Sequence, residues 1–513
     1  MRLFVKLKLM LMTLGLLIWF GLGNAPPPVF AASLVVNNLA DNTTGGDGQC
    51  TLREAINNAN SNSDTTAGDC ATGQATLDTI TFVVSGQIIL SGPADEDGNA
   101  SGDLDILSSA GPLTLDGDER ITLNGNENDR LLDLLPGGSD TLILDGLTIQ
   151  RGRITTAAGG GGVRRSTDGD VIIRNCFISD NTISVLTNDT TFIVGGGVRS
   201  SGPLSIQDST ISGNSISVIG DMNRFVDGGG LYSGGGDVTL TGSTISDNSI
   251  TVMGDSNEFV EGGSLSNGGG SLTFNINSST ISGNVVNVSG NGSRFVGGGG
   301  LANGGGGLTF NINNSTISGN SVNVTGNDSE FVGGGGITNG GGSLTFNLNN
   351  NTVTGNTVNT SGSNNTSVRG GGIDNGGGSN TFNFNNNIVT GNSATTDPDI
   401  GDTSGIVSNG RNVIGVDSMG ADFATAGDDV GTPPANVINL ILAQNGGSTR
   451  THLLVLGSPA LDQGDLVVCF GSAINGVDQR GAPRDGAACD IGAVEGIRFF
   501  GTVRLYLPVV IKM

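Results

Sequence analysis

The chain has 513 residues and a formal net charge of −25, from 22 Lys and Arg against 47 Asp and Glu. So acidic a protein repels nucleic acid and anionic lipid, which excludes nucleic-acid binding, although it could attract divalent cations. Glycine is abundant, with 90 residues, but it does not recur at every third position. A collagen triple helix is therefore excluded.

The first 32 residues predict a signal peptide. Arg2, Lys6 and Lys8 form a basic start, residues 9–22 are apolar, and small residues follow before Ser33. The apolar run is shorter than the about 20 residues of a spanning helix. An uncleaved anchor is the alternative interpretation. We expect a secreted or cell-surface protein with no membrane span after cleavage.

Five cysteines lie in the chain, and export would permit disulfides between them. We expect the local pairs Cys50–Cys70 and Cys469–Cys489, each closing a loop worth roughly 3 kcal/mol in the chain-entropy model. Cys176 is left over in the apolar phase of a strand-like segment, which predicts a buried thiol.

The middle of the chain repeats every 33 to 36 residues. Within a repeat, Leu308, Phe310 and Ile312 alternate with Thr309 and Asn311, the period of a half-buried strand. Such short strands cannot each bury a face alone, so stacked copies must pair in parallel about 4.8 Å apart. The sequence therefore predicts an all-β fold, a right-handed parallel β-helix with capped ends.

Equivalent side chains of stacked repeats form ladders along the axis. We expect two phenylalanine columns, Phe225, Phe259, Phe295 and Phe331, and Phe274, Phe310, Phe346 and Phe382. A recurrent asparagine, first seen at Asn181, predicts an amide ladder at a turn. Its members are Asn214, Asn248, Asn284, Asn320, Asn356 and Asn392.

The sequence leaves the number of rungs per repeat open. One interpretation is a single rung with about 13 residues, Ser321 to Gly333 in one copy, extending from one side; the other is two short rungs. A β-propeller is the rival fold. Propeller blades usually carry aromatic signatures, whereas the only tryptophan, Trp19, lies in the predicted signal peptide.

The two ends resemble known domains. Residues 50–60, CTLREAINNAN, resemble the CSLREA N-terminal domain of bacterial secreted β-helix proteins, with Thr51 in place of the usual serine. Residues 445–452, NGGSTRTH, resemble the start of the choice-of-anchor Q domain, and residues 478–481 and 489–495 continue the match. These resemblances imply a β-helix architecture and export, and they imply no established activity.

The resulting division of the chain has six parts. They are a signal peptide (1–32), a CSLREA-like cap with first rungs (33–158), the repeats (159–396), a transition (397–436), a choice-of-anchor Q-like domain (437–496) and a C-terminal tail (497–513). The tail reads either as a final strand or as a surface-retention signal.

One segment is rich in oxygen ligands. Asp95, Asp97, Asn99, Asp103 and Asp105 lie close together in the sequence and are compatible with a calcium site. The alternative is a purely structural role for the last two aspartates. No other cofactor is predicted.

No catalytic residue is predicted. His452 is the only histidine and belongs to the C-terminal motif, and Arg480 and Arg484 do not reproduce a lyase arginine pattern. A second charged group, Arg164 and Arg165 with nearby aspartates, predicts a solvated turn.

Asp478, Arg480, Asp490 and Glu495 predict a buried ion-pair cluster in the C-terminal domain. We therefore expect a non-catalytic extracellular protein that mediates adhesion or contact with matrix, glycans or surface proteins. The alternatives are a carbohydrate-active lyase or hydrolase-like enzyme and a structural spacer. The oligomeric state is left open.

Overall fold

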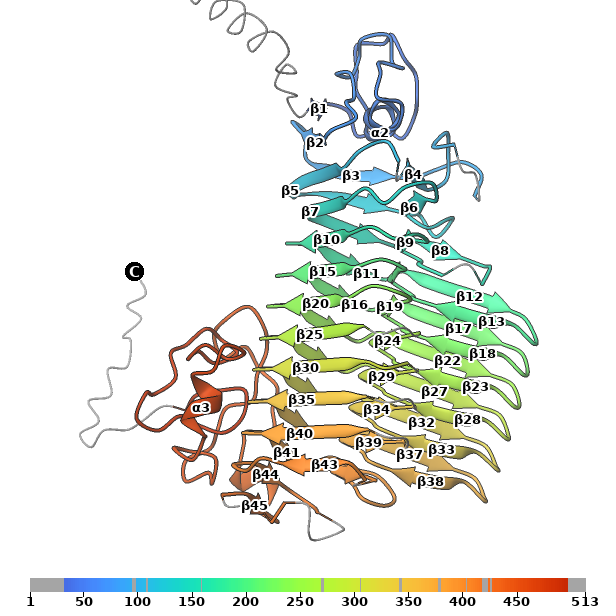
Figure 1. The fold of residues 1–513 in the computed structure, drawn as a ribbon. Coiled ribbons are helices and arrows are strands. Elements are labelled where there is room, and N and C mark those ends of the chain that lie inside the picture. The colour runs from blue at the N-terminus through green and yellow to red at the C-terminus, as the bar shows by residue number, and fades with distance from the viewer. Residues whose placement is uncertain are drawn as a thin grey trace, which may run out of the picture.

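The computed structural model describes residues 32–496, except 95–97, 108, 158, 269–271, 305, 341–343, 377–379, 403, 418–422 and 425–426. Strands of successive rungs pair in parallel and stack along a single axis (Figure 1). The predicted parallel β-helix is confirmed. The predicted signal peptide and C-terminal tail lie outside the described residues. No helix among those described is long and apolar enough to cross a membrane.

Each repeat forms one rung. In a central copy the rung consists of β30 (Thr309–Asn313), β31 (Thr316–Ser318), β32 (Ser321–Thr325), β33 (Glu330–Gly333) and β34 (Ile337–Asn339). Thr309 pairs with Thr345, its equivalent 36 residues later. This register settles the open question in favour of one rung per repeat.

Two sheets, A and B, form the main coil. Sheet A contains β1 (Ala32–Val36), β2 (Asp78–Phe82), β3 (Gly86–Ile89), β5 (Leu113–Asn124), β7 (Leu142–Gln150), β10 (Val171–Arg174), β11 (Phe177–Ser179), β15 (Leu204–Gln207), β16 (Thr210–Ser212), β20 (Val238–Thr241), β21 (Thr244–Ser246), β25 (Thr273–Asn277), β26 (Thr280–Ser282), β30, β31, β35 (Thr345–Asn349), β36 (Thr352–Thr354), β40 (Thr381–Asn385), β41 (Ile388–Thr390), β43 (Ile406–Ser408), β44 (Val413–Ile414) and β45 (Asp429–Val430). Sheet B contains β4 (Leu104–Leu107), β6 (Leu132–Leu135), β9 (Val163–Arg165), β14 (Val198–Ser200), β19 (Leu231–Ser233), β24 (Leu265–Asn267), β29 (Leu301–Asn303), β34, β39 (Ile373–Asn375) and β42 (Ile400–Gly401).

The segment predicted to extend from one side forms a second, narrower layer pair, which we call the fin. Its sheet C contains β8 (Arg153–Ile154), β12 (Thr182–Leu186), β17 (Ser215–Ile219), β22 (Ser249–Met253), β27 (Val285–Ser289), β32 and β37 (Thr357–Ser361). Its sheet D contains β13 (Thr191–Val194), β18 (Arg224–Asp227), β23 (Glu258–Glu261), β28 (Arg294–Gly297), β33 and β38 (Thr366–Arg369). In Figure 1 the fin projects to the right of the coil.

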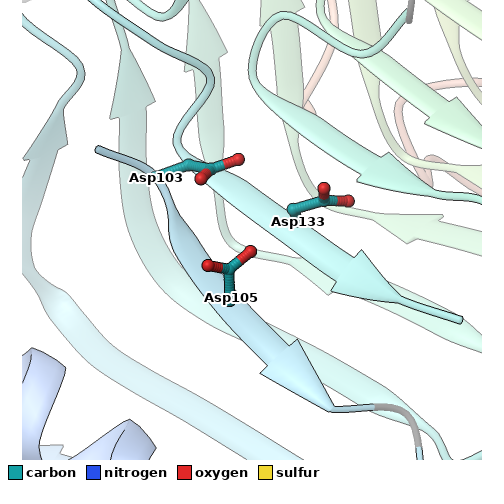
Figure 2. A group of neighbouring side chains, drawn as sticks. All are labelled: Asp103, Asp105 and Asp133. Carbon is teal, nitrogen blue, oxygen red and sulfur yellow. The ribbon is translucent and has the colours of Figure 1, made fainter. Parts of the chain in front are cut away.

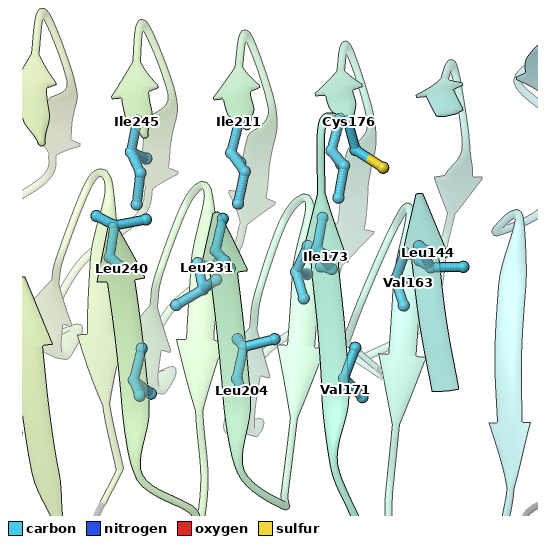
Figure 3. Close-up of a cluster of buried hydrophobic side chains, with 14 of the residues drawn as sticks. Leu144, Val163, Val171, Ile173, Cys176, Leu204, Ile211, Leu231, Leu240 and Ile245 are labelled. Carbon is cyan, nitrogen blue, oxygen red and sulfur yellow. The ribbon is translucent and has the colours of Figure 1, made fainter. Parts of the chain in front are cut away.

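The coil and the fin have separate hydrophobic cores. Ile211 and Ile245 stack in one column of the coil core (Figure 3), and Ile178 (0% exposed) precedes them in the same column. The fin core consists mainly of valines, for example Val322 and Val332. The apolar residues that alternate with polar ones in the sequence therefore fill two separate cores, and each core consists of columns of like side chains.

Phenylalanine and cysteine also enter the coil core. The column Phe274–Phe310–Phe346–Phe382 stacks with ring centroids 4.4–4.7 Å apart. Cys176 is fully buried and free, and burial raises the pKa of its thiol to about 12. Such a thiol stays protonated and unreactive at neutral pH.

The recurrent asparagines form an amide ladder at the turn between β31 and β32. Asn320 donates from Nδ2 to Oδ1 of Asn356 (2.9 Å) and to the carbonyl of Ile281 (3.0 Å). Its own Oδ1 accepts from the backbone N–H (3.1 Å) and Nδ2 (2.9 Å) of Asn284. Four hydrogen bonds per fully buried side chain lock each turn to its neighbours.

The N-terminal end is covered by α2 (Leu52–Ser61). Thr51 and Glu54 form a capping box at its start, and Leu52 and Ile56 bury their side chains in the coil core. The Cys50–Cys70 disulfide closes the adjoining loop.

The C-terminal segment contains a short 3₁₀ turn, Pro434–Asn436, and α3 (Leu466–Cys469), with a disulfide between Cys469 and Cys489. This segment does more than follow the last rung. It packs along the flank of sheet A beside the later rungs, as Figure 1 shows for α3.

Candidate functional site

An asparagine-lined groove of about 610 Å³ lies on the outer face of sheet A. Its floor consists of two columns of outward-facing side chains from β25, β30, β35 and β40, and Ser472 and Ala473 of the C-terminal segment form a wall. The asparagines that line it are Asn275, Asn277, Asn311, Asn313, Asn347, Asn349 and Asn385. Strand alternation places them here because Phe and Ile at intervening positions enter the core.

Amide hydrogen bonds fix the orientation of these side chains. Asn311 donates from Nδ2 to Oδ1 of Asn275 (2.9 Å), and Asn347 donates likewise to Asn311 (2.8 Å). The second column repeats this arrangement at 2.9 Å from Asn349 to Asn313. An asparagine amide has two N–H donors and two acceptor positions. Each bond in a column uses one donor and one acceptor, so a further N–H and a further lone pair remain to meet a ligand.

Side chains of the C-terminal segment hold the groove wall in place. Gln479 donates from Nε2 to the carbonyl of Ser279 (3.1 Å) and accepts from the hydroxyl of Thr316 (2.6 Å). Arg484 donates from Nη2 to Oδ1 of Asn314 (2.8 Å). These contacts join residues 163 to 200 positions apart, so sequence patterns did not reveal the groove.

The predicted ion-pair residues meet in this segment. Arg480 pairs with Asp478 (2.6 Å), and the backbone N–H of Asp490 donates to the carboxylate of Glu495 (3.0 Å). Arg484, excluded above as a lyase residue, completes the cluster through its contact with Glu495 (3.4 Å). The arrangement ties the segment together around buried charges.

His452 belongs to the same interface. Its Nδ1 lies 2.7 Å from the carbonyl of Asn439, which can only accept, so Nδ1 carries the proton. Nε2 then accepts from the hydroxyl of Ser318 (2.8 Å). Burial lowers the pKa of His452, because the charged imidazolium would lose its hydration.

We expect acidification to weaken the docking of the C-terminal segment through His452. Between the unfolded pKa of about 6.5 and the lower folded value, the unfolded chain binds more protons, so stability falls as the pH falls. Melting of this segment between pH 8 and pH 5 should show the loss. In His452→Gln the part of the loss caused by the imidazole should vanish; an unchanged pH slope would contradict the assignment.

The structure brings together part of the predicted calcium ligands. Oxygens of Asp103, Asp105 and Asp133 lie within 4.8 Å of one another (Figure 2). Asp133 joins them because β4 and β6 pair with Asp105 opposite Asp133. Asp95 and Asp97 lie outside the described residues. The side chain of Asn99 donates from Nδ2 to the carbonyl of Arg53 (3.0 Å) and to Oδ1 of Asn57 (2.8 Å).

Arginine side chains already reach this carboxylate cluster. Nη1 of Arg130 lies 3.1 Å from Asp103 and 3.0 Å from Asp133, and Arg164 pairs with Asp133 from the next rung. Burial, reinforced by the carboxylate of Asp129, raises the pKa of Asp103 to about 8. Since Nη1 of Arg130 bridges two of the three carboxylates, a calcium ion would have to displace it.

Calcium should therefore stabilise an Arg130→Met variant more than the unaltered protein. Removing the guanidinium takes the arginine partner from the buried Asp103, whereas Asp133 keeps Arg164, and breaking such a buried pair costs about 3–5 kcal/mol. Calcium can restore the missing charge through Asp103, Asp105 and Asp133. Melting curves with calcium and with a chelator would measure this. A calcium-dependent shift as large in the unaltered protein would show instead that an ion displaces Arg130.

The predicted solvated turn is confirmed for its aspartates, Asp168 and Asp170, which are exposed, but it is wrong for Arg165. The side chain of Arg165 is buried inside a turn. Its guanidinium donates to the carbonyls of Thr167, Asp140 and Asp168, and these hydrogen bonds replace those it would make to water. Arg164 is half-buried and pairs with Asp133.

No family model matches this chain, and no curated protein matches its sequence. The resemblance of the two ends to the CSLREA and choice-of-anchor Q domains therefore stays a prediction.

Proposed function

We propose that this protein is a non-catalytic extracellular β-helix that binds neutral glycans in the asparagine-lined groove of sheet A. The two amide columns carry the proposal. They present repeated donor–acceptor pairs about 4.8 Å apart along the axis, close to the length of a sugar unit in an extended chain. Neighbouring hydroxyls of a sugar can bond such an amide through both its N–H and its oxygen.

The groove favours a neutral ligand. Its lining residues are asparagines with one serine and one alanine, and none is charged. A uronate or sulfated chain is negatively charged and would be repelled by the protein, whose net charge is −25. General acid–base chemistry needs positioned titratable groups, and the lining supplies none.

An extracellular location is consistent with two disulfides and with the lack of a membrane-spanning helix among the described residues. Disulfides persist in oxidising compartments. The resemblance of the ends to domains of secreted β-helix proteins supports the same location. Adhesion to a cell wall or matrix would follow from glycan binding at such a surface.

Binding to a panel of immobilised neutral and acidic polysaccharides tests the proposal. We expect binding to a neutral chain, and we expect the fourfold variant Asn311→Ala, Asn313→Ala, Asn347→Ala and Asn349→Ala to bind at least about tenfold more weakly, since each lost hydrogen bond contributes about 1 kcal/mol. The melting temperature of the variant checks its fold.

The fin offers a matched control. Asn323 and Asn359 form the same kind of amide bond (3.0 Å) on sheet C, outside the groove. Alanine at both positions should leave glycan binding unchanged. Equal loss in both variants, binding only to acidic chains, or release of reducing or unsaturated sugars would overturn the proposal. The last outcome would favour a carbohydrate-active enzyme.

A further inference from the structure

A phenylalanine column runs along the outer face of sheet D in the fin. The rings stack with centroids 4.8–5.0 Å apart and interplanar angles of 4–8°. The column extends the predicted one by a residue at its N-terminal end: Phe192, Phe225, Phe259, Phe295 and Phe331. Phe192 and Phe331 at its ends remain 48% and 42% exposed. The three inner rings are half-buried, and so regular a partly exposed apolar stripe indicates a contact surface.

The backbone does not require phenylalanine in this column. Each of the five residues has a φ between 55° and 64°, which disfavours a bulky side chain. The phenylalanine sits in a bulge that is left out of the strand pairing. Between β18 and β23, for example, Arg224 pairs with Glu258 and Val226 with Val260. In the last rung the same position is Ser367, with a φ of 51°. Serine can therefore occupy this backbone position. Five phenylalanines held in a disfavoured conformation indicate that their side chains have a function.

The stack does not offer a sugar-binding platform. Neighbouring rings cover one another's faces, so the exposed parts between the ends of the column are ring edges. Sugars stack on open aromatic faces, whereas ring edges suit close packing against another apolar surface. The partner is therefore apolar at this stripe, and it differs from the ligand of the groove on sheet A.

A charged column flanks the stripe and alternates in sign. From rung to rung the residues are Thr191, Arg224, Glu258, Arg294, Glu330 and Thr366. Arg224 pairs with Glu258 (3.1 Å) and Arg294 with Glu330 (3.0 Å). These side chains remain between 23% and 55% exposed, so they can also meet a partner.

Read in the opposite direction, this column is complementary to itself. With the two-fold axis between Glu258 and Arg294, a second fin placed antiparallel sets Arg224 opposite Glu330, and Glu258 opposite Arg294. Phe225 then faces Phe331 and Phe259 faces Phe295, while Phe192 faces Ser367 of the last rung. A parallel second fin would place like charges together. Self-complementarity of this kind is what a two-fold interface requires.

We propose that the outer face of sheet D binds a second copy of this chain in antiparallel orientation. The stripe supplies the apolar contact, and the alternating column sets the direction and register. Six strands make a small interface, so the dimer is weak and concentration-dependent. Two grooves in one particle would strengthen attachment to a glycan surface by avidity.

Sedimentation analysis of the full chain up to high micromolar concentration tests the dimer. We expect reversible dimers for the unaltered protein and monomers for a variant with Phe225→Ser, Phe259→Ser and Phe295→Ser. Serine follows the native Ser367, so the bulge is kept, and circular dichroism checks the fold. A monomer at every concentration, or dimers unaffected by the three substitutions, would overturn the proposal. Loss of dimers without loss of glycan binding separates this inference from the proposed function.

An inverted charge column tests the orientation. The variant R224E, E258R, R294E and E330R keeps both ion pairs within the column and remains complementary to itself. We therefore expect it to form dimers, but not with the unaltered protein, where arginine would face arginine. Energy transfer between differently labelled chains measures this. Mixed dimers as abundant as the pure ones would refute the antiparallel arrangement.

Discussion

Replacement of Asn320 by alanine should destabilise the central rungs by at least about 4 kcal/mol. The substitution removes four hydrogen bonds and leaves the carbonyl of Ile281 and the amide groups of Asn284 and Asn356 buried without these partners. Each such buried group costs about 1–3 kcal/mol. Hydrogen exchange of the neighbouring turns, with a denaturant series, measures the free energy of local opening.

Asn359 provides the control for this prediction. Its side chain also belongs to an amide column, donating to Asn323 (3.0 Å), but it lies on the exposed face of the fin. Asn359→Ala should change stability by less than about 0.5 kcal/mol. Equal effects at Asn320 and Asn359 would show that burial of the ladder does not matter. In a solenoid the damage should stay close to the altered rung, since each rung contacts only its neighbours.

Replacement of Arg484 by methionine should release the C-terminal segment from the coil. The buried guanidinium donates to the carbonyls of Asp490 (3.0 Å) and Gly492 (2.8 Å) and to Asn314 on the coil (2.8 Å). Loss of a buried charge that satisfies so many acceptors costs about 3–5 kcal/mol. Limited proteolysis should then cleave residues 437–496 faster while the rungs remain protected.

Arg174 is the matched control for Arg484. It pairs with Asp145 (2.8 Å) on the coil, but its side chain is 44% exposed, and such pairs contribute at most about 1 kcal/mol. Arg174→Met should leave proteolysis unchanged. If Arg484→Met also left the segment protected, the docking would have to depend on other contacts. Because Ser472 and Ala473 form the groove wall, the Arg484 variant should also bind glycans more weakly.

Several features could be predicted from the sequence because they are local or periodic. The alternation of Phe310 and Ile312 with Thr309 and Asn311 records which strand face is buried, and the fold follows from it. The phenylalanine columns follow from the repeat of 33 to 36 residues, since equivalent positions of successive copies lie above one another. Those features depend on neighbouring residues and one constant register.

The candidate site was less accessible from the sequence. Asn311 and Asn313 read as ordinary outward residues of a strand, and only the C-terminal segment packed beside them makes a groove. Asp133 could not be added to the predicted calcium ligands from the sequence, because it reaches them only through the pairing of β4 with β6. Both require knowledge of which distant segments lie side by side.

The amino-acid sequence by itself determined the parallel solenoid and its columns of like side chains, and it offered a segment extending from the rung, Ser321 to Gly333, as one of two interpretations. The tertiary structure alone decided that one rung forms per repeat, that the segment folds into a fin with its own valine core, and that the C-terminal segment lies along the coil. The physical reason is distance along the chain. Periodicity records burial within a strand, whereas hydrogen bonds such as those of Gln479 and Arg484 join surfaces whose complementarity appears only after both have folded.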